Sequence, residues 1–163
     1  MANRYENLAD LWKKIEDVKI GMFTTLTAQE QLHARPMTAL EVDADGVLWF
    51  YTSLHSELAK DISRQPLANI SFAEPKDSFY VSLSGQAEFI SDRKQYERLW
   101  SPMIKAWFPR GIDDPDLVLI RFRIADAAYW DSDSSRMVQM LKMLTAAVTG
   151  NRPDMGAHGQ VRM

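Results

Sequence analysis

The chain has 163 residues, of which 46% are hydrophobic and 25% charged, the balance of one globular domain that can bury its own core. The formal net charge of −3 argues against a nucleic acid as the main partner, and the absence of cysteine excludes disulfides, thiolate metal sites and a cysteine nucleophile. The amino terminus mixes charges without a continuous apolar run, and no later stretch approaches bilayer length. We therefore expect a cytoplasmic protein with no membrane partner.

The amino-terminal half predicts one helix and then strands. Apolar residues recur at helical spacing between Tyr5 and Val18, which indicates an amphipathic helix. Segments rich in β-branched and aromatic residues follow at 21–27, 34–42 and 47–53. Asp45-Gly46 lies between the last two and is typical of a tight hairpin turn, because these residues tolerate positive φ. A short helix is expected over 56–65, ended by the proline that follows it.

The carboxy-terminal half predicts further strands and two helices. Strands are expected at 67–73, 77–91 and 117–130, the last segment as a strand pair. Gly85 in the middle of the second indicates a bulge or a sharp corner of a barrel. A helix that begins at Asp92 should be kinked or divided by Pro102. A Met-rich helix should begin at 134 or 135 and end at Gly150.

The connections between the expected strands indicate the fold class. Most strands are joined by short links, and none alternates regularly with crossover helices. This pattern favours an α+β domain built on an antiparallel, closed or nearly closed β-barrel over a doubly wound parallel sheet. We expect residues 1–150 to form this single domain and residues 151–163 to be a flexible tail, since the tail has no apolar periodicity.

Motifs for metal binding, triphosphate binding and nucleophilic catalysis are missing from the sequence. The three histidines, His33, His55 and His158, have no metal-ligand spacing, and there is no dinucleotide-binding glycine motif, phosphate-binding Gly-Lys-Thr loop or Gly-x-Ser-x-Gly elbow. The aspartates within 113–116 are typical of a solvated turn. We therefore expect no metal site, and an enzyme built on this chain would depend on a bound cofactor.

Three segments in a fixed order carry the functional signal. In ARPMTALEVDADGVLWFYTSLHSELAKDISRQP (34–66) an Arg begins one strand, a hairpin follows, and the next strand ends in Tyr-Thr before a Ser-initiated helix. SFAEPKDSFYVSLSGQAEFISD (71–92) and AWFPRGIDDPDLVLIRFRIADAAYWD (106–131) come next. Together they resemble the flavin-binding part of the pyridoxamine 5′-phosphate oxidase superfamily, and the last segment is similar to its general stress protein 26 branch. The resemblance covers roughly residues 5–132 and implies an FMN-binding antiparallel split β-barrel.

The resemblance also implies a set of cofactor-binding residues. They are Arg35, Pro36, Met37, Thr38, Tyr51, Thr52, Ser53, Ser56, Lys60, Trp107 and Trp130. Arg35 lies at the family's phosphate position, where a guanidinium can donate two hydrogen bonds to the phosphate. The residues just after it would face the flavin ring, the hydroxyls at the end of the next strand would close over the phosphate, and the two tryptophans would wall the site. The cofactor would be FMN or FAD, bound at the interface of a homodimer.

Seven of these residues also have an ordinary structural interpretation. Arg35 would then be an exposed residue of an edge strand, and Met37 would fill the core. The hydroxyl residues at the strand end would form a turn and a helix cap. The two tryptophans would be anchors of a core or of an interface.

An independent feature of the composition predicts the homodimer. The chain holds more large apolar side chains than the interior of one small barrel needs. They include Trp49, Phe50, Trp100, Trp107, Phe108, Tyr129 and Trp130, with Met137, Met140 and Met143 near the carboxyl terminus. Aromatic residues and methionine are enriched at interfaces, so we expect two copies to share the surplus.

Two departures from the family pattern limit what is carried over. Glu57 and Leu58 occupy the places where the oxidases have Arg-Lys in contact with phosphate. Either Lys60 and Arg64 compensate, or FMN affinity is weakened, or another flavin is preferred. Leu40 replaces a substrate-binding lysine and the carboxy-terminal Arg-Leu-His motif is absent, so we do not expect oxidation of pyridoxamine phosphate.

The leading functional prediction is a flavin-dependent oxidoreductase of unknown substrate, with no side chain assigned a catalytic role. A non-enzymatic flavin carrier or sensor is the first alternative. The second is a split barrel that has lost flavin, or has exchanged it for haem or a deazaflavin. Turnover with a nicotinamide reductant separates the enzyme from the carrier, and the visible spectrum of the purified protein identifies the cofactor.

Overall fold

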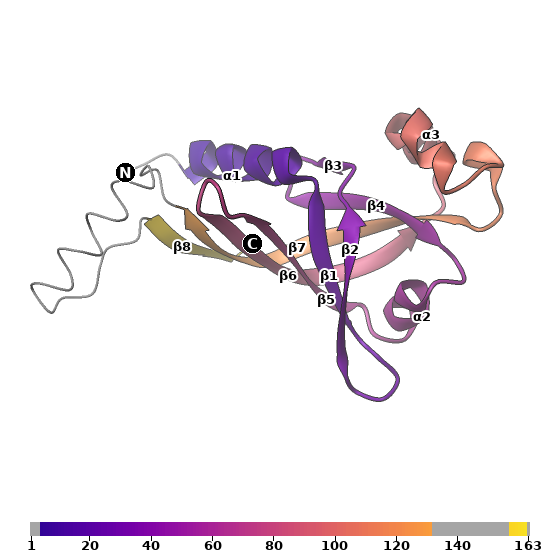
Figure 1. Ribbon diagram of the computed structural model, residues 1–163, viewed down its shortest axis with the longest axis horizontal. Helices are drawn as coiled ribbons and strands as arrows, with labels where there is room; N and C mark the ends of the chain where they lie inside the picture. Colours follow the sequence, from indigo (N-terminus) through magenta and orange to yellow (C-terminus); the bar gives the residue numbers. More distant parts are fainter. Residues whose placement is uncertain (1–3, 132–156, 163) are drawn as a thin grey trace, which may run out of the picture.

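The computed structural model describes residues 4–131 and 157–162 (Figure 1). The elements in chain order are α1 (Arg4–Val18), β1 (Ile20–Leu26), β2 (Leu32–Thr38), β3 (Glu41–Val42), β4 (Val47–Ser53), α2 (Glu57–Arg64), β5 (Leu67–Glu74), β6 (Phe79–Ile90), α3 (Arg93–Leu99), the 3-10 segments η1 (Pro102–Ala106) and η2 (Gly111–Asp113), β7 (Leu117–Asp131) and β8 (Ala157–Arg162). The strands form one antiparallel sheet in the order β2-β1-β5-β6-β7-β4-β3, and β8 pairs with β7 beyond this path.

The two edges of this path are joined by a link too short for a flat sheet. From Thr38 at the end of β2 to Glu41 at the start of β3 the chain takes three residue steps, which reach about 11 Å at most. Seven flat strands about 4.8 Å apart would hold the edge strands about 29 Å from one another. The sheet must therefore roll up, and this rolled antiparallel sheet is the split β-barrel that the sequence predicts.

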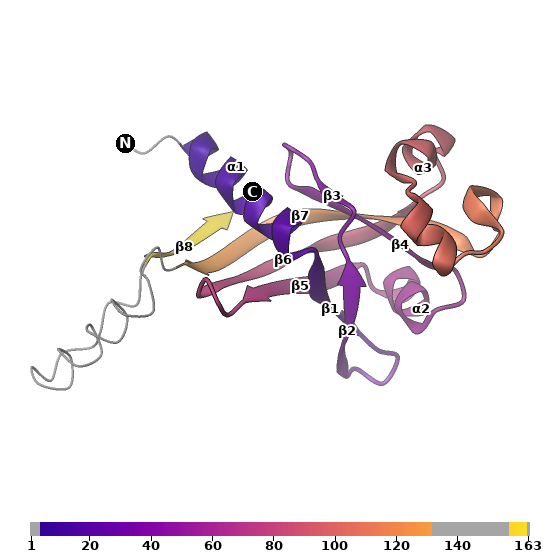
Figure 2. The same cartoon turned by 45° about the horizontal axis from the view of Figure 1, so that its top comes forward.

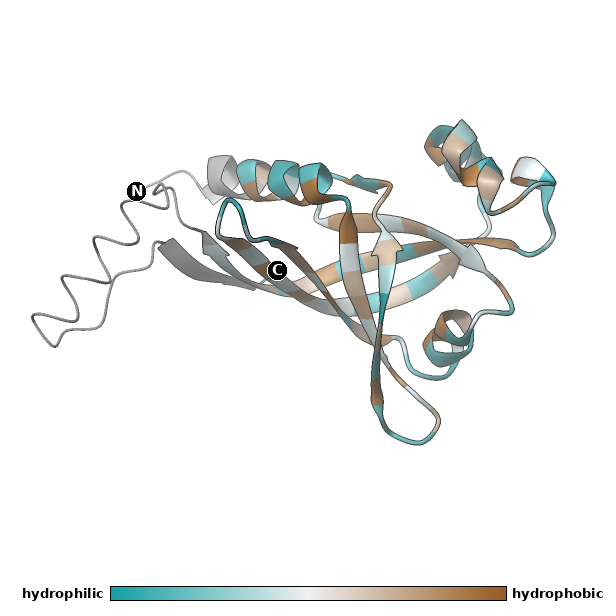
Figure 3. Ribbon diagram, in the orientation of Figure 1, coloured by the Kyte–Doolittle hydropathy of each residue, from teal (hydrophilic) through white to brown (hydrophobic). Residues whose placement is uncertain are grey.

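Alternation of side chains along the strands places the core inside the roll. Phe23 on β1 packs edge-to-face against Phe50 on β4 and Phe122 on β7, with ring centroids 5.3 Å and 5.9 Å apart. All three rings are fully buried. Figure 3 shows apolar and polar residues alternating along the elements, as expected where one face is buried.

Helices cover parts of the roll. In α1, Leu11, Trp12 and Ile15 are buried in the main core, which explains the apolar stripe in the sequence. Helix α2 connects β4 to β5 and buries Leu58 and Ile62 in the same core. Figures 1 and 2 place α1 and α2 on different parts of the barrel, with α3 and the 3-10 segments at one end.

A second, smaller core lies under α3. Leu99 of α3 packs there with Trp49 of β4 and Leu119 of β7. Pro102 separates α3 from η1, so the expected helix from Asp92 is divided, as predicted. The register of β6 and β7 shifts at Ser84/Gly85, which confirms the bulge at this glycine.

Two expected strand boundaries and the expected tail differ from the structure. The segment 34–42 is divided into β2 and β3, because Ala39 and Leu40 carry the chain from one sheet edge to the other. The segment 117–130 is not a strand pair but one 15-residue strand, since it contains no Gly or Pro to turn it. Residues 157–162, expected within a loose tail, form β8 because β7 extends past β4 and offers it a paired edge. The Met-rich helix over 134–150 lies outside the described residues.

Candidate functional site

Arg35 lies on β2 opposite Phe23 of β1, and its side chain points to the same side of the strand as Met37, which packs on the core. Nη1 of Arg35 donates to the Thr25 hydroxyl, and Nη2 donates to Asp61 Oδ2 at 3.3 Å and to His33 Nδ1 at 3.1 Å. The Arg35 side chain is 17% exposed. The interpretation of Arg35 as a simple exposed edge residue is therefore wrong, because its guanidinium is held on three sides.

Asp61 is the residue that holds Arg35, and the sequence interpretation missed it. Its side chain is 6% exposed, and its Oδ2 also accepts a 2.7 Å hydrogen bond from the buried Thr25 hydroxyl. Arg64, one turn later, approaches Oδ1 at 3.7 Å. A signal for Asp61 exists in the sequence: it lies on the apolar face of α2 between Leu58 and Ile62, where a carboxylate requires a cationic partner.

The hydroxyls expected around the phosphate gather at the start of α2. Ser56 is the N-cap and accepts a 3.1 Å hydrogen bond from the amide of Ala59. The hydroxyls of Thr52 and Ser56 are hydrogen-bonded to each other at 3.1 Å. Five helical positions separate this cap from Asp61, which corresponds to about 7.5 Å along the axis. Arg35 contacts α2 at Asp61, and Thr52 contacts its N-cap at Ser56. The structure therefore holds these two strand residues against neighbouring turns of α2.

The loop before the cap is fixed to the start of β7. The amide of His55 donates to the Ser53 hydroxyl at 3.1 Å, and His55 Nδ1 donates to Asp116 Oδ1 at 2.6 Å. Hydrogen bonds from the Ser53 side chain and from His55 lower the pKa of the Asp116 carboxyl. The Asp116 carboxylate thus lies beside the loop that precedes α2.

Lys60 and Glu57 form an ion pair on the outer side of α2. Nζ of Lys60 donates to Glu57 Oε1 at 2.7 Å, and the two side chains are 63% and 72% exposed. Arg64 donates to the carbonyl oxygen of Leu26 at the end of β1. Both candidate compensating cations, Lys60 and Arg64, therefore have partners within the chain.

Tyr51 is engaged by α3. Its hydroxyl donates to the carbonyl oxygen of Tyr96 at 2.7 Å, and its ring makes edge contacts with the rings of Tyr96 and Trp100. Burial, together with the nearby Tyr96, raises the pKa of the Tyr51 hydroxyl to about 12. These contacts give Tyr51 a structural role beneath α3.

The remaining predicted residues are spread over the molecule. Pro36 and Thr38 are exposed on β2, on the side opposite Arg35. Trp107 follows η1 and is 82% exposed, whereas Trp130 lies near the far end of β7 and is 50% exposed. Strand β7 is about 45 Å long at 3.3 Å per residue, and Figures 1 and 2 show the 3-10 segments beyond its Leu117 end. One protomer therefore does not bring the two tryptophans together.

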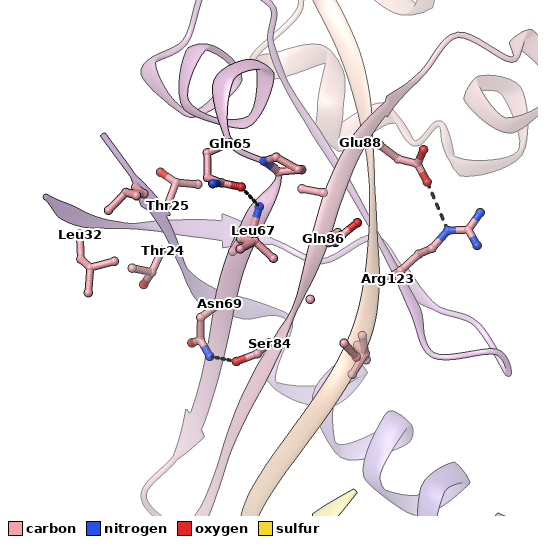
Figure 4. A pocket seen from close by; sticks show the side chains of 17 residues that line it. Thr24, Thr25, Leu32, Gln65, Leu67, Asn69, Ser84, Gln86, Glu88 and Arg123 are labelled. Carbon is pink, nitrogen blue, oxygen red and sulfur yellow. Dashed lines mark hydrogen bonds and ion pairs between the residues drawn. The ribbon is translucent and has the colours of Figure 1, made fainter. Parts of the chain in front are cut away.

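The outer face of the sheet is hollowed beside this site. A hollow of about 1300 Å³ crosses β1, β5, β6 and β7, from Leu32 and Thr25 at one side to Arg123 at the other (Figure 4). Asn69 in its centre donates to Ser84 at 3.0 Å, and Arg123 donates to Glu88 at 3.2 Å. A second hollow of about 420 Å³ on the same face is lined by exposed apolar side chains. They are Ile20, Met22, Tyr80 and Trp130.

Within residues 4–131 and 157–162 no three His, Asp or Glu side chains come together as ligands for a metal ion. No helix in the same ranges is long and apolar enough to cross a membrane.

A family model described as pyridoxamine 5′-phosphate oxidase like matches residues 6–154. The chain belongs to this family. A solved structure of a candidate general stress protein 26 from Jannaschia sp. CCS1 is similar, with a TM-score of 0.78, 28% identity and coverage of 97% of this chain and 99% of that one. The general stress FMN/FAD binding protein of Xanthomonas citri gives a TM-score of 0.68 and 30% identity over 77% of this chain and 89% of its own.

A relative from Neurospora crassa extends the likeness. Protein bli-3 is 26% identical over 155 residues, which cover 89% of this chain and 74% of bli-3. The chain thus belongs to the general stress protein 26 branch of the family, as its sequence motifs predict.

Leu58 and Leu40, the two apolar residues that depart from the family pattern, are both packed in the structure. Leu58 is buried in the main core, so the position after Glu57 offers an apolar side chain and no phosphate donor. Leu40 packs in the smaller core beside Trp49, and its amide donates to the Trp49 carbonyl oxygen at 2.8 Å. Both positions are used for packing.

Proposed function

We propose that the chain binds a flavin nucleotide, FMN or FAD, with its phosphate at Arg35, and acts as a cytoplasmic flavin-dependent oxidoreductase. The family assignment supports this proposal, as does the similarity to the Xanthomonas citri protein described as FMN/FAD binding. A bound flavin would supply the redox chemistry, because the chain's own side chains offer none. The proposal concerns the group of residues around Arg35 and the start of α2.

The orientation of Arg35 carries the proposal. A guanidinium has five N–H donors. Within the described part of the chain, the Arg35 guanidinium donates three hydrogen bonds, to Thr25, Asp61 and His33. Two N–H groups are left for an anion, and the buried partners hold the plane of the group in place. A phosphate needs such charge-assisted donors, so the arrangement fits it.

The start of α2 provides the second part of the phosphate site. Amides at a helix N-terminus carry partial positive charge, and the cap residue Ser56 lies beside the Thr52 hydroxyl. These residues would bind and orient the phosphate through the helix amides, because their own hydroxyls already bond within the chain. Arg35 and the α2 cap would fix the phosphate, and the flavin ring would then extend along β2.

We further propose that two copies of the chain form the complete site. Leu67 and the side chains around the smaller hollow leave a large apolar area on the outer face of β1, β5, β6 and β7. Contiguous exposed apolar patches mark interaction sites. A second copy that covers this face would bury these side chains and close the larger hollow, in agreement with the surplus of large apolar residues.

Comparison of phosphorylated and unphosphorylated flavins tests the phosphate site. Titration of the purified protein should quench flavin fluorescence, and the Arg35→Ala/Asp61→Asn variant should weaken FMN and FAD binding by about tenfold to a hundredfold. Riboflavin binding should change little. The paired substitution avoids a buried carboxylate without a partner. Unchanged FMN and FAD affinities would remove Arg35 from the site.

A non-enzymatic flavin carrier or sensor is the second candidate. It is favoured by the hydroxyls of Tyr51, Thr52 and Ser56, each of which has a structural hydrogen-bond partner and so is committed to packing or capping. Anaerobic mixing of the flavin-loaded protein with NADH or NADPH, followed by air, distinguishes the two. Repeated turnover supports the oxidoreductase, and tight binding without turnover supports the carrier.

A further inference from the structure

The hydrogen bonds of Arg35 occupy particular edges of its guanidinium. Nη1 donates to the Thr25 hydroxyl and Nη2 donates to Asp61 Oδ2, and these two acceptor oxygens are 2.7 Å apart. A guanidinium is a planar fork, so two acceptors this close together on different terminal nitrogens lie at its end, between Nη1 and Nη2. The second N–H of Nη2 therefore points along the other edge, which Nη2 shares with Nε.

His33 occupies this second edge. Its Nδ1 lies 3.1 Å from Arg35 Nη2, and both side chains leave the same side of β2 because they are two residues apart. Arginine has no acceptor, so Nδ1 of His33 accepts and the ring is neutral with its proton on Nε2. The two N–H groups that Arg35 has left are that of Nε and the outer one of Nη1, which share no edge. A phosphate can take two parallel hydrogen bonds from Arg35 only where His33 withdraws.

Protonation of the His33 ring would make it withdraw. With a proton on Nδ1 the ring cannot accept from Arg35, and two like charges 3.1 Å apart repel each other. His33 is exposed, so its ring can turn into solvent without disturbing the core. A protonated ring beside Arg35 also supplies a second cation for a phosphate, in a site where Leu58 is buried and offers no donor.

The other charged groups around this pair lie on α2 and in the turn before β2. Asp61 is held at the end of the Arg35 fork, and Arg64 donates to the carbonyl oxygen of Leu26, which pairs with the residue before His33. Glu30 lies in the turn between β1 and β2. Carboxylates and guanidinium groups ordinarily keep their charge between about pH 6 and 8, whereas histidine changes its charge there. His33 is therefore the group of this set that responds to pH in that range.

We infer that His33 is a positioning residue for the phosphate site: its neutral ring blocks the bidentate edge of Arg35, and its protonated ring leaves that edge open and adds a cation beside it. Binding of a phosphorylated flavin should therefore strengthen as the pH falls. The inference rests on the proposed flavin-binding function and adds to it the residue that controls access to Arg35.

Titration of the full chain with FAD at about pH 6 and about pH 8 tests the inference. FAD is the probe because its diphosphate keeps its charge in this range, whereas a phosphate monoester such as that of FMN titrates near pH 6. The wild type should bind FAD about tenfold more tightly at the lower pH. Riboflavin has no phosphate and should bind alike at both.

Two substitutions of His33 separate the acceptor from the charge. His33→Gln keeps an acceptor that takes no proton, so its FAD affinity should stay at the wild-type value for about pH 8 throughout. His33→Leu removes the acceptor, so its FAD affinity at about pH 8 should exceed that of the wild type severalfold and depend little on pH. Nitrogen NMR of the free wild type at about pH 8 should show the His33 proton on Nε2.

His55→Gln is the matched control, because His55 is also an exposed histidine but is bonded to Asp116 and not to Arg35. It should leave the pH dependence of FAD binding unchanged. Loss of the pH dependence in this control, or its persistence in both His33 variants, overturns the assignment to His33. Equal FAD affinities of the wild type at the two pH values overturn the inference and leave flavin binding intact. Binding of no flavin overturns the proposed function as well.

Discussion

Arg35 on β2 donates a hydrogen bond to Asp61 Oδ2 on α2 at 3.3 Å, and the Thr25 hydroxyl on β1 donates to the same oxygen at 2.7 Å. One buried carboxylate oxygen thus joins a sheet edge, its neighbouring strand and a helix. The pair has a structural role whether or not a ligand is bound. Its contribution to stability can be measured apart from flavin binding.

Removal of either partner should destabilise the fold. Asp61→Ala and Arg35→Ala should each lower the free energy of unfolding by about 2–3 kcal/mol, because each leaves a largely buried charge without its partner. The double variant should be less destabilised than the sum of the two by about 1 kcal/mol or more. Urea unfolding of the four proteins measures this coupling. Glu97→Ala, which breaks an exposed pair with Arg93, is the control and should cost much less than either of these variants. Additive losses would show that Arg35 and Asp61 do not interact.

Gly85 is required where β6 passes close to the backbone of β7. A Cβ built at this position lies 1.9 Å from the carbonyl oxygen of Arg123, a backbone atom that cannot move without disturbing the bulge. Gly85→Ala should therefore lower the free energy of unfolding by about 3 kcal/mol or more. Gly111→Ala is the comparison: it has a φ of +78° and open space around it, so backbone strain of about 1–2 kcal/mol is its expected cost. Equal losses in thermal or urea unfolding would contradict the close approach.

Tyr51 should make the protein less stable in strong alkali. Its pKa is raised from 10.0 to about 12 in the folded chain, so the unfolded chain loses this proton first as pH rises. The stability that depends on the protonated hydroxyl is complete below pH 10 and is lost between pH 10 and about 12. Tyr51→Phe should flatten this part of the stability profile. It should also lower stability at pH 7 by about 0.5–1.5 kcal/mol, through loss of the bond to the Tyr96 carbonyl oxygen. A profile with the same slope in Tyr51→Phe would assign the alkaline loss to another group.

The sequence predicts the parts of the fold that local chemistry controls. Asp45-Gly46 makes the turn between β3 and β4, Pro102 divides the helical segment, and Gly85 marks the bulge. The passage from β2 to β3 is different, because β2 pairs back onto β1 and β3 pairs forward onto β4, which places the two strands at opposite ends of the strand order. The sequence of the two linker residues, Ala39 and Leu40, is compatible with a strand, and only the strand order shows that they connect two separate strands.

In the candidate site, too, local sequence does not predict the contacts between distant segments. The family motif identifies Arg35, but its partner Asp61 is 26 positions away, and no local pattern joins them. The Tyr51 hydroxyl is engaged by a carbonyl group 45 positions later, so a motif position expected in the cofactor site has a structural use. Contacts between distant segments decide which polar groups are available to a ligand, and they follow from the closed sheet and not from the motif.

Leu67, which lies on the proposed interface, and Trp107, which the sequence predicts to line the flavin site, test the shared site. Both are exposed in one protomer, at 82% and 56%, so a charged residue at either position should not disturb the core. Trp107→Glu and Leu67→Glu should lower the fraction of dimer and the flavin affinity together, because burial of a charge in an apolar interface is costly. Light scattering and flavin titration on the same samples measure both quantities. Lys76→Glu, in the exposed β5–β6 turn, is the control and should change neither. A monomeric wild type, or a monomeric variant with the flavin affinity of the wild type, would refute a site built by two copies.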